Sequence, residues 1–274
     1  MNMTEQARTA WDGVAEGYDA YVTPRVIALA EEVLGRVHVR PGTRLLDVAA
    51  GSGALALAAA RLGAHVVATD IAPGMIARLE ARARDERLTD VESRVMDAYS
   101  LELEDDAFDV SASQLGVTVL PELSRALGEM VRVTKPGGHV VVAALGPPQK
   151  AEFFGFFLAA LKASVPSFTG PPAGSPPVQF QVADLAKFHE RLVEARLRDI
   201  SVDTITFSLE FPSARHFWGF VTSSNPMGRV LVADLTDEQQ ADVQEVLAGM
   251  LRERSNGTGA AALSIDVNVA VAAK

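Results

Sequence analysis

The sequence predicts an α/β fold built on a seven-stranded, mainly parallel sheet with helices on both faces. Five short apolar segments in the first part of the chain alternate with helical patterns, at 44–49, 65–70, 91–96, 108–113 and 139–145. A helix between successive strands is the usual parallel crossover. Two longer alternating segments, 200–211 and 263–272, lack such a crossover, so we expect an antiparallel pair at the sheet edge.

Composition limits the class of protein. The 274 residues suit one large domain, and 48% apolar with 22% charged residues is typical of a soluble globular protein. The absence of cysteine excludes disulfides, a thiolate nucleophile and cysteine-based metal sites. No segment resembles a signal peptide or could cross a bilayer. We therefore expect a cytoplasmic protein without a membrane span, either a monomer or a homodimer.

The charge balance points to a small-molecule partner. The chain has 35 acidic and 25 basic side chains, a formal net charge of −10. Nucleic-acid binders cluster lysine and arginine to neutralise phosphates, whereas the basic residues here are scattered. We therefore expect no nucleic acid as partner.

The first part of the chain divides into a lid and a core. Residues 1–40 are expected to form a helical lid, because Trp11, Val14 and Tyr18 follow helical spacing in 4–19 and an apolar-faced helix follows at 26–37. The core is expected at 41–146. Its helices are predicted at 54–62, 74–87 and 123–133, and a turn at 135–138 precedes the fifth strand.

The regular alternation ends at Leu145, and two inserts follow, 147–182 and 212–259. The first contains an aromatic cluster at 153–157 and a Pro/Gly/Ser-rich stretch at 170–177 that is typical of a mobile loop. The second contains helical patterns at 215–221 and 237–254. Another helix is expected between the two inserts, at 182–197. Ligands of open α/β sheets bind at the carboxyl ends of the strands. We expect both inserts to cap that edge within a single domain, 1–274.

A glycine-containing turn follows the first strand. Ala49, Gly51 and Gly53 lie between Asp47 and the next helix. Glycines let the backbone approach a ligand, and the N–H groups of a helix N-terminus favour anionic groups. The pattern also matches part of the dinucleotide-binding fingerprint, so the glycines alone leave two classes of cofactor open.

Carboxylates at the ends of three strands narrow this choice. Asp47 stands four residues before Gly51, where it is awkward beside a pyrophosphate but suits an ammonium group. Asp70 can accept from both ribose hydroxyls, a feature that NAD enzymes share. Asp97 can accept from an adenine amino group while the Ala98 backbone contacts the ring. The pattern indicates a ligand with an amino acid at one end and adenosine at the other.

The chain resembles the class I S-adenosylmethionine-dependent methyltransferases, and within them the small-molecule group that includes the ubiquinone and menaquinone methyltransferases. The resemblance covers residues 11–145 in the family's order: WDGVAEGYDAY, LLDVAAGSG, VVATDIAPGM, RVMDAYSL, FDVSASQLGVTVLP and VTKPGGHVVV. It implies a Rossmann-like fold, with S-adenosyl-L-methionine as methyl donor and S-adenosyl-L-homocysteine as product. Many members have a glycine where this chain has Ala49.

The resemblance also implies which positions contact the cofactor. In chain order they are Tyr18, Asp47, Ala49, Gly51, Gly53, Asp70, Ile71, Met75, Asp97, Ala98 and Gln114. The loop after the first strand would hold the methionine part, and Asp70 the ribose. Ile71 and Met75 would flank the adenine, Gln114 would approach the methionine part, and Tyr18 would close over the cofactor.

The acceptor site is expected in the inserts. The candidate substrate contacts are Phe153, Phe157, Trp218 and Asn225, and a helix packed on the core is the alternative for the aromatic cluster. His216 is the candidate general base, which is required only if the acceptor must lose a proton. No carboxylate-rich pattern indicates a metal site, so no metal is expected.

The sequence therefore predicts a methyltransferase that acts on a small, apolar or aromatic metabolite at oxygen, carbon or nitrogen. One alternative is a protein of the same fold that binds the cofactor without methylating, as a partner subunit or in other chemistry. The second alternative is an NAD-dependent oxidoreductase. It requires a second three-stranded half with its own crossovers, which the terminal strand pair contradicts.

Overall fold

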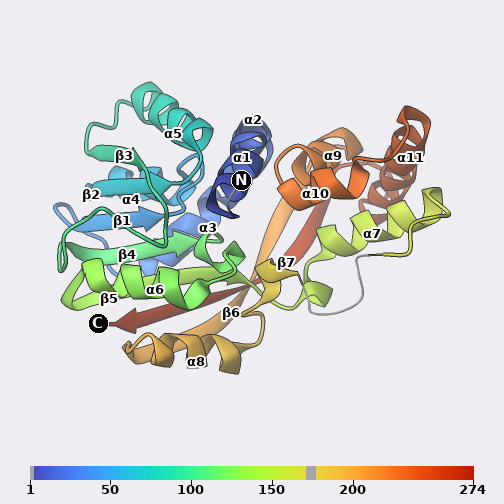
Figure 1. The fold of residues 1–274 in the computed structure, drawn as a ribbon. Coiled ribbons are helices and arrows are strands. Elements are labelled where there is room, and N and C mark those ends of the chain that lie inside the picture. Colours follow the sequence, from blue (N-terminus) through green and yellow to red (C-terminus); the bar gives the residue numbers. More distant parts are fainter. Residues whose placement is uncertain (1–2, 171–176) are drawn as a thin grey trace.

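The computed structural model describes residues 3–170 and 177–274, so most of the predicted loop at 170–177 lies outside the described residues. Within the described ranges, seven strands form one sheet in the order β3-β2-β1-β4-β5-β7-β6 (Figure 1). They are β1 (Arg44–Val48), β2 (His65–Asp70), β3 (Val91–Val95), β4 (Phe108–Gln114), β5 (Thr134–Leu145), β6 (Arg198–Phe211) and β7 (Ala261–Ala273). The first five are parallel, and β7 is antiparallel to β5 and β6. The predicted fold class is confirmed, with β6 as the edge strand.

Helices cover both faces of the sheet because the strands alternate between two hydrophobic clusters. Leu45 packs in a cluster with α3 (Thr23–Gly35) and α4 (Ala54–Arg61), and α5 (Pro73–Asp85) adds to it. Leu46, the next residue, packs with α6 (Leu123–Val133) and α8 (Leu185–Glu194) on the other face. Successive strand side chains point to opposite faces, so a strand buried on both sides is apolar at consecutive positions.

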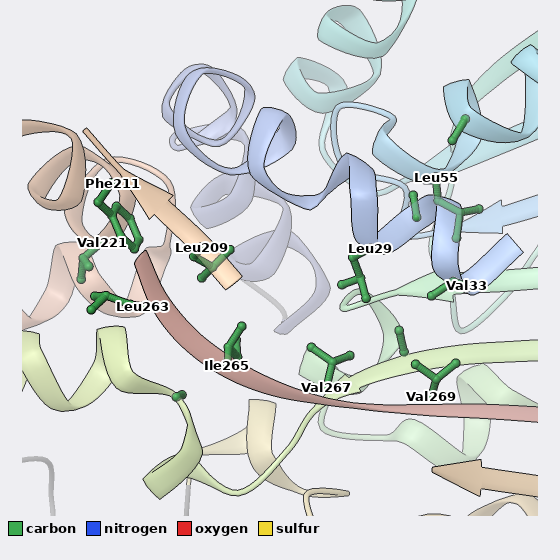
Figure 2. Close-up of a cluster of buried hydrophobic side chains, with 14 of the residues drawn as sticks. Leu29, Val33, Leu55, Leu209, Phe211, Val221, Leu263, Ile265, Val267 and Val269 are labelled. Carbon is green, nitrogen blue, oxygen red and sulfur yellow. The ribbon is translucent and has the colours of Figure 1, made fainter. Parts of the chain in front are cut away.

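A helical cap is attached to the far end of the β6–β7 hairpin. Figure 1 shows these two strands extending past the rest of the sheet towards the cap, which consists of α7 (Glu152–Ser164), α9 (Ala214–Thr222), α10 (Pro226–Val232) and α11 (Asp237–Arg254). One hydrophobic cluster follows the hairpin from α3 into the cap, from Leu29 through Val267 to Phe211 (Figure 2). Core and cap therefore share one continuous apolar interior.

A buried amide fastens the hairpin to the segment before α8. Asn268 on β7 is 0% exposed. Its Oδ1 accepts from the hydroxyl of Thr204 on β6 at 2.8 Å, and its Nδ2 donates to the carbonyls of Val182 and Ala183 at 3.2 and 2.8 Å. A buried amide with partners at both ends costs little and orients what it contacts.

The N-terminal region departs from the single helix expected at 4–19. The chain forms α1 (Met3–Asp12), α2 (Ala15–Gly17) and a π-helical turn, η1 (Tyr18–Val22). Tertiary contacts interrupt the helix: Gly74 N–H donates to the Asp12 carboxylate at 2.6 Å, and Arg229 donates to the Gly13 carbonyl at 2.8 Å. These bonds connect the N-terminal region to both the core and the cap.

Three shorter elements also differ from expectation. The predicted turn at 135–138 is part of β5, where the pairing with β4 shifts register between Phe108 and Val110. Pro136 has no N–H to donate, so an irregular ladder at this point is expected on physical grounds. Helix α10 was not predicted, although Asn225 caps it by accepting from Met227 N–H at 2.8 Å. The 3₁₀ turns are η2 (Val117–Val119), η3 (Pro148–Lys150) and η4 (Val178–Phe180).

Candidate functional site

The loop after β1 is a tight turn at the carboxyl end of the sheet. Ala49 and Gly51 both have left-handed backbone angles, with φ of 56° and 55°. A Cβ on Gly51 would lie 3.0 Å from a ring carbon of Tyr18, so a side chain there would crowd that ring as well as strain the backbone. Gly53 has φ of 93°, and a Cβ there would lie 2.7 Å from the Leu79 side chain. Gly53 therefore allows α4 to pack against α5, and it does not line the cavity described below.

Asp70, at the end of β2, holds this loop in place. Its carboxylate accepts from Gly51 N–H and from Ala72 N–H, both at 2.9 Å. The residue is 8% exposed, and burial raises the pKa of its carboxyl although these backbone hydrogen bonds lower it in part. Asp70 lines the cavity and retains acceptor capacity for a ligand.

Asp47, at the end of β1, is a buried carboxyl without partners. It is 1% exposed, and neither of its oxygens has a hydrogen-bond partner among the described residues. Burial and, to a smaller extent, the Asp70 carboxylate raise the pKa of its carboxyl to about 8, although the nearby Ala56 N–H lowers it in part. Two neighbouring carboxyls that repel each other form a site that favours a cation. Asp47 lies behind the loop and does not line the cavity.

Tyr18 covers the loop that follows β1. Its ring faces Gly51, and its pKa is raised by burial and by the carboxylates of Asp70 and Asp47. Trp11 of α1 packs edge-on against it, with ring centroids 6.3 Å apart. The π-helical turn that carries Tyr18 is of a kind often found at functional sites.

These groups surround a cavity of about 410 Å³, called the larger cavity below. Its walls come from the carboxyl ends of β1 to β4, from α1 and from the segment before α6. The predicted contacts among its lining residues are Tyr18, Ala49, Gly51, Asp70, Ile71, Met75, Asp97 and Ala98. Met96, Tyr99, Glu122 and Arg125 also line it. The Asp97 carboxylate accepts from Tyr99 N–H at 2.9 Å, which orients it at one end of this cavity.

A second cavity, of about 140 Å³, lies between the core and the cap and is called the apolar cavity. Its walls come from η1, α3, α7, α9, α10 and the β6–β7 hairpin. Phe153, Phe157 and Asn225, three of the predicted substrate contacts, line it, and Phe154 and Phe180 complete its aromatic wall. Helix α7 is thus both packed on the core and part of the cavity wall.

The two cavities meet at a shared wall of four side chains. Trp11, Tyr18, Leu115 and Val119 line both of them. Leu115 has a left-handed backbone, with φ of 57°. Ser113, two residues before Leu115, holds this loop. Its hydroxyl donates to the Val48 carbonyl at 2.7 Å and accepts from Val117 N–H at 3.0 Å. Strained backbone of this kind often occurs at functional sites.

Besides Asp47 and Gly53, three further predicted site residues line neither cavity. Gln114 is buried below the shared wall, where its amide donates to the Val26 carbonyl at 3.0 Å, and it lines neither cavity. Trp218 packs against Phe157 with ring centroids 6.2 Å apart, behind the wall of the apolar cavity. His216 is exposed, and its Nδ1 lies 2.9 Å from Ser213 Oγ at the start of α9. These positions give no support to direct ligand contact by Gln114, Trp218 or His216.

Sequence reasoning missed several lining residues. Trp11 was noted only for helical spacing, and Leu115, Val119 and Phe180 were not selected because single apolar residues in loops carry no local signal. Only Leu115 could have been found, as the residue after the predicted contact Gln114. Among the described residues, no group of three or more His, Asp or Glu side chains could hold a metal, and no helix has the length and apolarity to cross a membrane.

Comparison with known proteins identifies the family. Residues 46–142 match the family model described as a methyltransferase domain. The demethylmenaquinone methyltransferase of Renibacterium salmoninarum is 31% identical over 186 residues, which cover 66% of this chain and 76% of that protein. The chain belongs to the class I S-adenosylmethionine-dependent methyltransferases. The resemblance stated from the sequence is confirmed, and with it the family's cofactor, S-adenosylmethionine.

Other relatives of this methyltransferase chain are more divergent or match in part. A Mycobacterium tuberculosis protein (strain H37Rv) is 37% identical over 169 residues, or 61% of this chain, but the match spans only 59% of that protein. Among solved structures, the cyclase SpnF aligns over 100% of this chain and 97% of its own with a TM-score of 0.63 at 19% identity. A phosphoethanolamine N-methyltransferase of Haemonchus contortus in complex with S-adenosyl-L-methionine covers 90% of this chain and 52% of its own, with a TM-score of 0.55 at 19% identity. The solved structures support the fold.

Proposed function

We propose that this chain transfers a methyl group from S-adenosylmethionine, bound in the larger cavity, to a small apolar acceptor bound in the apolar cavity. The observation that carries the proposal is the shared wall, because it adjoins one cavity lined partly by carboxylates and one lined mostly by apolar side chains. A donor and an acceptor bound in adjoining cavities react as if within one molecule. Demethylmenaquinone, the acceptor implied by the name of several relatives, is an apolar molecule of this general kind.

The residues of the larger cavity, together with Asp47 behind its loop, fit the cofactor. Asp47 and Asp70 favour the positive charge that the amino and sulfonium groups of S-adenosylmethionine carry. Asp70 would accept from the ribose, and Asp97, with Ala98, would read the adenine edge between Ile71 and Met75.

Transfer requires little chemistry from the protein. The bound cofactor supplies an activated methyl: a lone pair on the acceptor forms the new bond to the methyl carbon while the carbon–sulfur bond breaks, its electron pair remaining on sulfur. Trp11 and Tyr18 of the N-terminal lid exclude water from this point. The inserts 147–182 and 212–259 position the acceptor.

Titration calorimetry with S-adenosylmethionine, S-adenosylhomocysteine and NAD tests the cofactor. We expect both sulfur nucleosides to bind and NAD not to bind; NAD binding alone would refute the proposal. Incorporation of labelled methyl over a panel of apolar metabolites then tests transfer. Cofactor binding without incorporation on any acceptor would favour the alternative, a protein of this fold with non-methyl chemistry. SpnF, whose name describes a cyclase, shares the fold.

A further inference from the structure

The two cavities differ sharply in charge. The larger cavity is lined by Asp70, Asp97, Glu122 and Arg125 among its residues. Among the described residues that line the apolar cavity, none is Asp, Glu, Lys, Arg or His. Residues 171–176, which the structure does not describe, contain only proline, alanine, glycine and serine. Among the described residues that line this cavity, no charged side chain is therefore placed to pair with a charged acceptor.

The polar groups of the apolar cavity are all neutral. They come from Trp11, Tyr18, Thr118, Gln179, Ser224 and Asn225. Asn225 uses its carbonyl oxygen to cap α10, which leaves its amide N–H groups for another partner. Thr118 is 1% exposed and lines this cavity. A hydroxyl at the wall of a cavity can donate to or accept from an uncharged ligand.

Desolvation makes this arrangement selective. A charge transferred from water into an apolar site is strongly disfavoured unless an opposite charge pairs with it, whereas a hydroxyl or carbonyl needs only a neutral partner. A carboxylate, sulfonate or phosphate on the acceptor would contact hydroxyl and amide groups. It would not contact a cationic side chain among the described residues that line this cavity.

We propose that the apolar cavity selects uncharged acceptors, which it holds by apolar contact and by neutral hydroxyl and amide groups. This inference rests on the proposed function, because it assigns the substrate class of the same reaction. It adds that acceptors with a carboxylate or phosphate group are excluded, a distinction that family membership does not make.

The cavity also limits the chemistry of transfer. Tyr18 is the one titratable side chain among the described residues that line it, and burial together with Asp70 and Asp47 raises its pKa, so the phenol stays protonated at neutral pH. No described lining side chain can then act as an ionised base. The acceptor attacks through an electron pair that it already has, a lone pair on oxygen or nitrogen or the π electrons of an electron-rich carbon, and any proton that it carries is released to solvent with the product.

A pair of fluorescent probes with the same ring skeleton tests the selectivity. Phenylnaphthylamine is uncharged, and anilinonaphthalene sulfonate adds one negative charge. We expect the wild-type protein to bind the uncharged probe at least about tenfold more tightly, a difference of about 1.4 kcal/mol. Equal or tighter binding of the sulfonate by the wild-type protein would overturn the inference.

Two neighbouring substitutions locate the effect. Leu231 of α10 lines the apolar cavity, whereas Val230, the next residue back, is 70% exposed and does not. Leu231→Arg supplies a cation and should reduce the preference for the uncharged probe to below about threefold, while Val230→Arg should leave it unchanged. If both variants behave alike, the probes bind outside this cavity and the inference fails.

Affinity for S-adenosylhomocysteine, measured by calorimetry on the same preparations, separates the two proposals. Wild type and both variants should bind it alike, because neither substituted residue lines the larger cavity; this also shows that the variants are folded. If the wild-type protein does not bind S-adenosylhomocysteine, the proposed function is refuted. The ratio of the affinities for the two probes still reports on the charge selectivity of the cavity.

Discussion

Replacing Asp47 by asparagine should change how the stability of the protein depends on pH. Neither oxygen of the buried carboxyl has a hydrogen-bond partner among the described residues, and burial, with the Asp70 carboxylate, raises its pKa from the ordinary 3.8 to about 8. A group whose pKa is higher in the folded state contributes stability that is fully present below the unfolded pKa and is lost as the pH rises through the folded pKa. Asparagine resembles the protonated acid in shape but does not titrate, so Asp47→Asn removes this loss.

The size of the effect follows from the width of the window. The free energy of unfolding depends on this carboxyl at pH values between its unfolded and its folded pKa. From pH 5 to pH 8 the wild-type protein crosses about three pH units of this range and loses about 1.4 kcal/mol of stability for each unit. Relative to wild type, Asp47→Asn should therefore be more stable by about 4 kcal/mol at pH 8 than at pH 5. Urea unfolding at both pH values, at equal ionic strength and without cofactor, measures this difference.

A carboxylate with a lowered pKa provides the control. Arg61 hydrogen-bonds to Glu86 and lowers the pKa of that carboxyl, so its contribution is present above the unfolded pKa and is lost only as the pH falls below it. Glu86→Gln should change stability by the same amount at pH 5 and at pH 8. If Asp47→Asn also shows the same change at both values, Asp47 is ionised or hydrated in the folded protein and the reasoning is refuted.

Three further predictions concern the loop, the cofactor and the hairpin. Asp70→Asn should weaken binding of S-adenosylhomocysteine at least about tenfold, since the amide replaces one acceptor oxygen by a donor; an unchanged calorimetric affinity would exclude the ribose role. Gly51→Ala should weaken the same binding because its Cβ meets Tyr18 and its φ is 55°, whereas Gly128→Ala, in α6 with open space around it, should add up to about 1 kcal/mol of stability by thermal unfolding. Equal affinities of the Gly51→Ala and Gly128→Ala variants for S-adenosylhomocysteine would contradict the close contact between Gly51 and Tyr18. Asn268→Ala should cost about 2–4 kcal/mol in urea unfolding because it leaves buried groups unpaired, and the exposed Thr206→Ala should cost less than about 1 kcal/mol; equal costs would show that the amide network adds nothing.

Much of the fold could be predicted because its signals are local. The strand β2 and the helix α6 were predicted with the bounds that the structure has, since an apolar run or a 3.6-residue period lies within one short window. Elements with weak or conflicting local signals were not: α10 has seven residues, and β5 continues through a segment with the appearance of a turn. The break after Asp12 depends on bonds to Gly74 and Arg229, which no local pattern contains.

The site divides in the same way. Cofactor positions such as Asp70 and Asp97 stand at strand ends within a recognisable motif, and both line the larger cavity. The acceptor side has no motif, and only some of its predicted contacts line the apolar cavity. His216 was selected for its chemistry, but the geometry of α9 turns it towards Ser213 and solvent.

By itself, the sequence determined the order of strands and helices, the cofactor loop and the family, because each is written in residues close together in the chain. The tertiary structure alone decided where the two cavities meet. That wall joins Trp11 and Tyr18 to Leu115 and Val119, about a hundred residues away. Helix α10 lines the apolar cavity, and its Arg229 bonds to Gly13 across more than two hundred residues. Contacts over such separations depend on how the whole chain packs, and a local pattern cannot specify them.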